Sequence, residues 1–169
     1  MSFLSRIRPR LVVFDLDETL WPWGVDDFVM KPPYRKVKDG VRDARGVRMD
    51  PFPDVHDILK QLRENQIPMA AASRTTYPEG AFSLLKLLGW NELLQYKEIY
   101  PGSKITHFKR LNAASGVPFE DMIFYDNEDR NIVDVSKLGV TCVLVDSYTG
   151  VTWKSLEKGF KAFAERKKA

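Results

Sequence analysis

The sequence predicts an α/β fold, a three-layer sandwich in which helices cover both faces of a central parallel sheet. Short apolar runs alternate along the 169 residues with segments whose apolar positions recur every three or four residues. This alternation is typical of parallel strands joined by crossover helices. With 44% hydrophobic residues, the chain has enough apolar side chains for one core, so we expect a single domain over residues 1–169.

The expected strands are the apolar runs, and the expected helices lie between them. Strands are predicted at 11–14, 68–72, 96–99, 122–125 and 141–145. Helices are predicted at 54–66, 79–89, 104–116, 129–139 and 155–168, and two of the first three stop at a glycine, a frequent helix terminator. The last helix ends in a basic turn, which suits the negative end of the helix dipole.

Residues 21–52 interrupt this alternation. Proline, glycine and charged residues accumulate there, around WPWG, KPPY, KDG and ARG. Turn signals at Asp39-Gly40 and Arg45-Gly46 flank the alternating segments VRD and VRM, which indicates a small hairpin. An insert of about thirty residues is too short to build a core of its own. We therefore predict a small hairpin insert after the first strand and no large cap domain.

Composition excludes several classes of partner. A net charge of +3, from 26 basic and 23 acidic residues, is too mild to indicate a nucleic-acid surface. No apolar segment approaches the roughly 20 residues of a membrane span. The single cysteine, Cys142, has no partner for an internal disulfide, which fits a reducing compartment. We expect a cytoplasmic monomer, whose N-terminal MSFLSRIRPR favours a short solvated arm over a transit peptide.

Two acidic residues, Asp15 and Asp17, follow directly after the first apolar run, in VVFDLDETL. They are expected at the carboxyl edge of the sheet, where α/β proteins bind ligands. Two acids separated by one residue in an extended segment point the same way, so a cation between them or protonation of one must relieve their repulsion. A divalent metal ion is the simpler explanation, although glycosyltransferase metal sites and ordinary turn aspartates share the D-x-D pattern.

Three further strand ends carry polar groups. Ser73 follows the second apolar run, Lys104 opens the helix after the third, and Asp126 follows the fourth. Four successive strand ends thus present acid, hydroxyl, ammonium and acid. A receiver-type phospho-acceptor domain combines the same groups, but there the hydroxyl and the lysine follow the phosphorylated aspartate. Here they precede the last acid, which disfavours that alternative.

Taken together, these motifs resemble those of the haloacid dehalogenase (HAD) superfamily of aspartate-nucleophile phosphatases. Its first motif, D-x-D-x-[TV], matches the stretch from Asp15 to Thr19. The segments LWPW, AAASRT, YPGSKITHF and RNIVDVSKLGVTC extend the resemblance, over nearly the whole chain, to the magnesium-dependent phosphatase-1 subfamily. The resemblance implies a Rossmann-like, HAD-like fold.

The resemblance also implies a chemistry, the hydrolysis of phosphate monoesters through an aspartyl phosphate. Asp15 would be the nucleophile and Asp17 the general acid and base. Mg²⁺ would be held by Asp15, the carbonyl oxygen of Asp17, and Asp126. The residues expected to bind the phosphoryl group are Leu16 through its backbone, Thr19, Ser73, Arg74 and Lys104. Protein phosphotyrosine and sugar or fructosamine phosphates are the implied substrates, and a phosphotransferase or phosphomutase of the same superfamily is the alternative.

Simpler structural roles also fit several of these residues. Thr19 could cap the turn after the first strand, and Arg74 could pair with a surface acid. His56 and His107 lie within amphipathic helices, where an ordinary position on the helix face is expected.

The metal site departs from the subfamily pattern at one position. Where the subfamily commonly has two adjacent aspartates, this chain has Asp126 followed by Asn127, and then Asp129. Asn127 is expected to orient a metal-bound water more weakly than a carboxylate does. Asp129 is either an outer residue of the metal site or a first-turn acid that suits the helix dipole.

Overall fold

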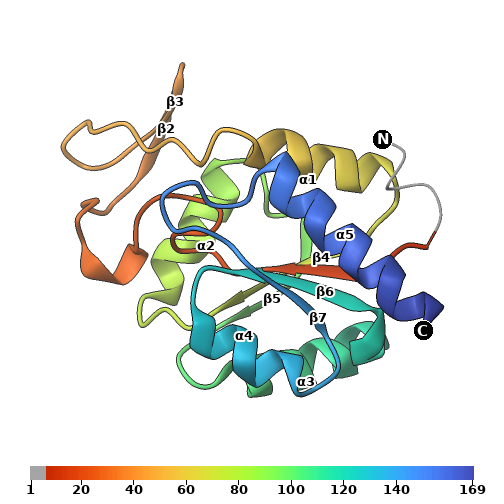
Figure 1. The fold of residues 1–169 in the computed structure, drawn as a ribbon. Coiled ribbons are helices and arrows are strands. Elements are labelled where there is room, and N and C mark those ends of the chain that lie inside the picture. Colours follow the sequence, from red (N-terminus) through yellow and green to blue (C-terminus); the bar gives the residue numbers. More distant parts are fainter. Residues whose placement is uncertain (1–6) are drawn as a thin grey trace.

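A five-stranded parallel sheet forms the centre of the computed structural model, which describes residues 7–169 (Figure 1). Its strands lie in the order β5-β4-β1-β6-β7, and each pairs in parallel with its neighbours. The strands are β1 (Leu11–Phe14), β4 (Met69–Ser73), β5 (Leu94–Ile99), β6 (Met122–Asp126) and β7 (Thr141–Leu144). The predicted α/β fold with a central parallel sheet is thereby confirmed.

Helices cover both faces of this sheet, as predicted (Figure 1). The helices are α1 (Val55–Glu64), α2 (Pro78–Leu87), α3 (Lys104–Ser115), α4 (Asp129–Ser136) and α5 (Trp153–Lys168), with short 3-10 turns η2 (Val25–Asp27) and η3 (Phe119–Asp121). Buried side chains of α1, α2 and α5 share one hydrophobic cluster, whereas those of α3 and α4 belong to a second cluster on the opposite face. No helix of residues 7–169 is long and apolar enough to cross a membrane.

The expected element boundaries differ from the observed ones by a few residues. Pro68 was expected to begin a strand but precedes β4, because proline has no N–H for the sheet ladder. Its carbonyl oxygen still accepts a hydrogen bond from Val12 N. The strand expected at 96–99 begins two residues earlier, at Leu94. The predicted N-terminal arm lies largely outside the described residues.

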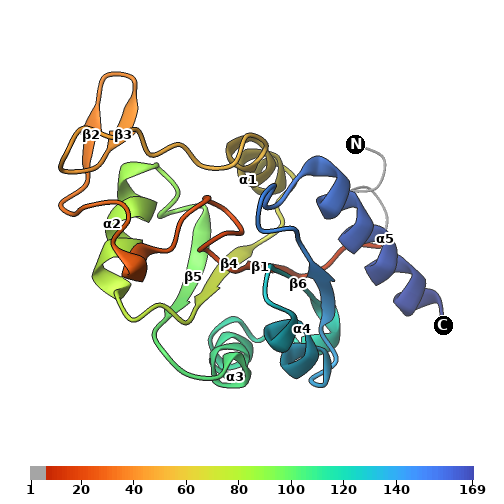
Figure 2. The same cartoon turned by 60° about the vertical axis from the view of Figure 1, so that its left-hand side comes forward.

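The insert contains the predicted hairpin (Figure 2). Strands β2 (Arg35–Val37) and β3 (Gly40–Arg42) pair antiparallel around the Asp39-Gly40 turn, where Gly40 has a φ of 140°. The turn at Arg45-Gly46 forms only a single bridge, between Arg42 and Arg48. The predicted small hairpin is therefore present, with its two strands on either side of the Asp39-Gly40 turn.

A buried aspartate organises the rest of the insert. The Asp43 carboxylate accepts hydrogen bonds from the backbone N–H groups of Lys31, Arg45 and Val47, and from the Arg45 guanidinium. Burial alone would raise the pKa of Asp43. The hydrogen-bond donors outweigh burial and hold this pKa well below its usual range. Hydrogen bonds to Asp43 thus hold together a segment that is too short to have a hydrophobic core of its own.

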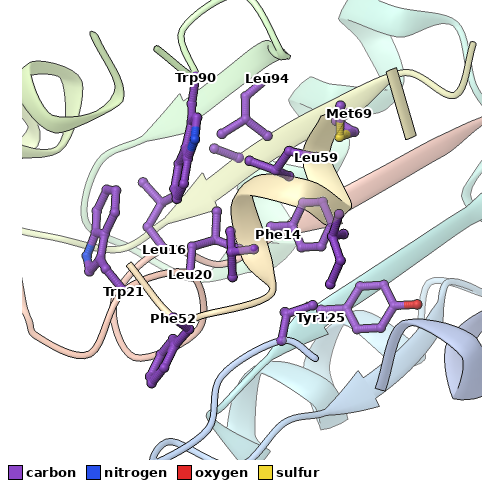
Figure 3. Packing of buried hydrophobic residues seen from close by; sticks show 14 of the residues in the cluster. Phe14, Leu16, Leu20, Trp21, Phe52, Leu59, Met69, Trp90, Leu94 and Tyr125 are labelled. Carbon is purple, nitrogen blue, oxygen red and sulfur yellow. The ribbon is translucent and has the colours of Figure 1, made fainter. Parts of the chain in front are cut away.

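Tryptophans at the start of the insert belong to the main core (Figure 3). Trp21 is fully buried and stacks on Trp23 and on Trp90, with ring centroids 5.9 Å and 6.3 Å apart. Leu16 and Leu20 lie in the same cluster. The insert is therefore fixed at its root by hydrophobic packing.

Candidate active site

The carboxyl ends of the central strands bring the predicted catalytic groups together. Lys104, only 1% exposed, places its Nζ 2.8 Å from Asp15 Oδ1 and 2.7 Å from Asp126 Oδ2. Asp15 follows β1 and Asp126 ends β6, and these strands are neighbours in the sheet. The prediction that these distant residues meet at one edge is confirmed.

The charges of this cluster do not balance. Two buried carboxylates, Asp15 and Asp126, share one ammonium group. Burial and the charge of Asp126 raise the pKa of Asp15 well above its usual value, against the lowering effect of Lys104 and Thr19. Burial by itself would lower the pKa of Lys104, but the two carboxylates outweigh it and raise that pKa. The cluster therefore suits an additional cation.

A hard divalent cation fits the donors that are present. Within residues 7–169, no three acidic, histidine or cysteine side chains form a metal cluster. A metal ion here would therefore have two carboxylates, Asp15 and Asp126, the Asp17 carbonyl oxygen and water or substrate oxygens. Mg²⁺ favours this kind of coordination, in which one or two carboxylates are combined with water and phosphate oxygens.

Asp17 lies in a different environment from Asp15. Its Oδ1 accepts hydrogen bonds from the Trp21 indole N–H, at 2.8 Å, and from the backbone N–H of Val25, at 3.3 Å. Burial raises the pKa of Asp17 to about 6, although these two donors oppose the shift. Asp17 can thus carry a proton close to neutral pH, which suits a general acid.

Thr19 lies directly against the Asp15 carboxylate. Its hydroxyl donates a 2.8 Å hydrogen bond to Asp15 Oδ2, and its side chain is fully buried. The backbone of Thr19 also forms a turn with Leu16. Neither Thr19 nor Leu16 lines the catalytic cavity. In this structure Thr19 contacts the Asp15 carboxylate, and the phosphate-binding role of both residues stays a prediction.

The catalytic cavity has a volume of about 180 Å³ and mostly polar walls. It is lined by Asp15, Asp17, Asp26, Ser73, Arg74, Thr75, Lys104, Glu128, Arg130 and Asn131. A larger hollow of about 630 Å³ between β7 and α5 contains none of the four strand-end groups, so we place the chemistry in the smaller cavity.

Arg74 is fixed by an amide that sequence reasoning missed. Arg74 Nη1 donates to Asn131 Oδ1 at 3.1 Å, and Asn131 Nδ2 donates to Asp126 Oδ2 at 3.0 Å. Arg74 has no acidic partner among residues 7–169, which removes the alternative of a surface ion pair. Its guanidinium is free to bind an anion in the cavity. Asn131 is a buried polar residue of α4, and no pattern in the sequence distinguishes it from the other polar residues of this helix.

The insert supplies one wall of the cavity through Asp26, another residue that the sequence did not reveal. Asp26 Oδ2 accepts hydrogen bonds from the backbone N–H and the hydroxyl of Thr76, at 3.0 Å and 3.1 Å. Next to it, the ring of Phe28 contacts that of Tyr77. These contacts connect the insert to the loop after β4, which also carries Arg74.

Asn127 and Asp129, which follow Asp126 in the sequence, have separate positions. Asn127 Oδ1 lies 3.2 Å from the Thr19 hydroxyl, and its Nδ2 donates to Glu18 Oε2 at 3.3 Å. Asp129 is exposed in the first turn of α4 and does not line the cavity. Asn127 therefore remains the candidate for tuning the metal site, and the position of Asp129 suits the helix dipole.

We expect Asn127→Asp to lower the Mg²⁺ concentration required for half-maximal activity, by up to about tenfold, because it adds a negative charge beside Asp15. Its loss of the donor to Glu18 works against this gain. Magnesium titration of Asn127→Asp and of Asn127→Asp/Glu18→Gln separates the two effects. An unchanged magnesium dependence in both variants would mean that position 127 does not tune the metal.

Comparisons with known proteins show the family to which the chain belongs. The model of the acid phosphatase family matches residues 7–166. Human magnesium-dependent phosphatase 1 is 51% identical over 158 residues, which cover 93% of this chain and 88% of that protein. A HAD-like hydrolase superfamily protein of Schizosaccharomyces pombe is 36% identical and covers 79% of this chain and 83% of its own length.

Solved structures support the same fold. A HAD-superfamily hydrolase from Ehrlichia chaffeensis superimposes with a TM-score of 0.66 at 12% identity, over 95% of this chain and all of that chain. The resemblance seen in the sequence motifs is confirmed. The chain belongs to the acid phosphatase family and, within the HAD superfamily, to the magnesium-dependent phosphatase 1 subfamily.

Proposed function

We propose that this magnesium-dependent phosphatase hydrolyses phosphate monoesters through a phosphoryl group carried on Asp15. The observation that supports this most strongly is the difference between two carboxylates on one cavity. Asp15 is held by Lys104 and Thr19, which orient it, whereas burial raises the pKa of Asp17 to about 6. Burial also raises the pKa of Asp15, to about 8, so its role as the nucleophile depends on a metal cation that would ionise it, and the assignment rests on the different partners of the two carboxylates.

The reaction has two displacements at phosphorus. An oxygen of Asp15 attacks, the bond from phosphorus to the ester oxygen breaks, and Asp17 gives its proton to the departing alcohol. Asp17, now ionised, takes a proton from water, whose oxygen attacks phosphorus and releases phosphate from Asp15. The second step returns both carboxylates to their starting forms.

Cationic and polar groups of the cavity bind the phosphoryl oxygens. The Ser73 hydroxyl and the Arg74 guanidinium line the cavity beside Asp15, and Lys104 contacts the nucleophile directly. Mg²⁺, when bound, supplies the positive charge that allows a phosphate dianion to approach a carboxylate.

We propose that the substrate is bulky, either protein phosphotyrosine or a sugar or fructosamine phosphate. The small hairpin insert contributes only Asp26 to the cavity lining, and no large cap covers it in residues 7–169. Assays of phosphopeptides and phosphorylated sugars at equal concentrations would rank these classes. Added sugar acceptors would reveal transfer instead of hydrolysis.

Trapping the intermediate tests the mechanism. In Asp17→Asn, no acid assists the leaving group and no base activates water, so an aryl phosphate with a good leaving group should phosphorylate Asp15 faster than water removes the phosphoryl group. Intact-protein mass spectrometry after rapid quenching should show one added phosphoryl group, and peptide mapping should locate it on Asp15. The double variant Asp15→Asn/Asp17→Asn is the control. Phosphoryl attachment at any other residue would refute the covalent route through Asp15.

A further inference from the structure

His107 is buried in α3, and the function proposed above does not use it. Its side chain is fully inaccessible, so the expectation of an ordinary position on the helix face is wrong. The ring instead faces the turn that connects β5 to α3. It stacks on Tyr100, with ring centroids 4.3 Å apart and planes inclined by 12°.

Both ring nitrogens of His107 face carbonyl oxygens. Nε2 lies 2.8 Å from the oxygens of both Ser73 and Tyr100, and Nδ1 lies 3.0 Å from the oxygen of Ser103. A carbonyl oxygen only accepts hydrogen bonds, and an unprotonated ring nitrogen also only accepts. With its proton on Nε2, the ring donates to the carbonyls of Ser73 and Tyr100 and connects the end of β4 to the turn before α3; with its proton on Nδ1, it donates to Ser103.

The three carbonyls belong to segments that carry phosphate-binding groups. Ser73 ends β4, and its hydroxyl lines the cavity. Ser103 is the N-cap of α3 and directly precedes Lys104, the ammonium between the two carboxylates. His107 thus lies where the end of β4 meets the start of α3.

We propose that His107 is a positioning residue, whose ring connects the Ser73 strand end to the start of α3 and thereby sets the Ser73 hydroxyl and the Lys104 ammonium in register for one phosphoryl group. The proposal rests on the proposed function for its catalytic consequence.

The second histidine of the chain, His56, provides an internal control. Its Nδ1 accepts a hydrogen bond from the Trp90 indole N–H, at 3.1 Å, instead of facing the turn before α3.

The positioning role is tested with His107→Phe, which keeps the ring stack on Tyr100 and removes the ring nitrogens. We expect roughly a tenfold increase both in KM and in the dissociation constant of inorganic phosphate. His107→Gln, which restores an N–H donor, should recover part of this loss and also serves if the Phe variant does not fold. His56→Gln should leave both constants unchanged.

A double-mutant comparison separates positioning from general support of the fold. If His107 acts through Ser73, His107→Phe must weaken phosphate binding less in a Ser73→Ala background than in the unmodified protein. An equal factor in both backgrounds would overturn the role. Phosphate binding needs no turnover, so a protein that bound phosphate as expected but hydrolysed no monoester would contradict the proposed function and leave this inference standing.

Discussion

Asp15→Asn should reduce turnover by about 10⁴-fold or more, because it removes the attacking oxygen of the nucleophile. The same substitution should raise the unfolding temperature at neutral pH without added metal. The pKa of Asp15 is higher in the folded state than in the unfolded chain, so its ionisation opposes folding as the pH rises. An amide keeps the shape of the side chain and removes this cost.

Steady-state assays and thermal unfolding measured on one preparation check both halves of this prediction. Asp57→Asn, an exposed acid in α1, is the matched control and should change neither quantity. Substantial hydrolysis by Asp15→Asn would rule out Asp15 as the nucleophile. A lower unfolding temperature would mean that the charge of Asp15 stabilises the cluster.

Lys104→Met should destabilise the protein by about 3–5 kcal/mol, the usual cost of removing one partner from a buried ion pair. Asp15 and Asp126 would then face each other without the ammonium that bonds to both. Denaturant unfolding measures the loss, and we expect activity to fall with it because the nucleophile loses its orienting contact.

The exposed lysine of the same helix, Lys109, supplies the control, since Lys109→Met should have little effect on stability. Adding Asp15→Asn to Lys104→Met should recover part of the lost stability, because one of the two unpaired carboxylates is then neutral. If the double variant were no more stable than Lys104→Met, repulsion between the carboxylates would not be the cause.

The fold and the central cluster were predictable because they depend on simple periodicities. An apolar strand such as Leu11–Phe14 is readable wherever it occurs, and parallel strands place their carboxyl ends at one edge. Asp15, Lys104 and Asp126 therefore meet as the sequence indicates. The alternation of strands and helices predicts the parallel direction that puts these strand ends on one edge, whereas the order of the strands in the sheet is known only from the structure.

The residues that support this cluster were not predictable in the same way. His107 and Asn131 occupy helix positions whose importance depends on the rotation of α3 and α4 against the sheet, which helical spacing alone does not determine. The hydrogen bond from the buried Thr19 hydroxyl to Asp15 is likewise visible only in the structure. Interactions of this kind depend on side-chain directions, which no pattern of residue types encodes.

The hydrogen bond between Asp17 and Trp21 links the proton carrier of the site to the cooperative unfolding of the whole domain. Before the Trp21 indole proton can exchange with solvent, this hydrogen bond must break. The indole is also held in place by its stacking on Trp23 and Trp90. Protons held in this way exchange through large openings, whereas exposed loops exchange through small local ones. Asp17 therefore shares the slow opening of the core, although it follows the strand as part of a turn.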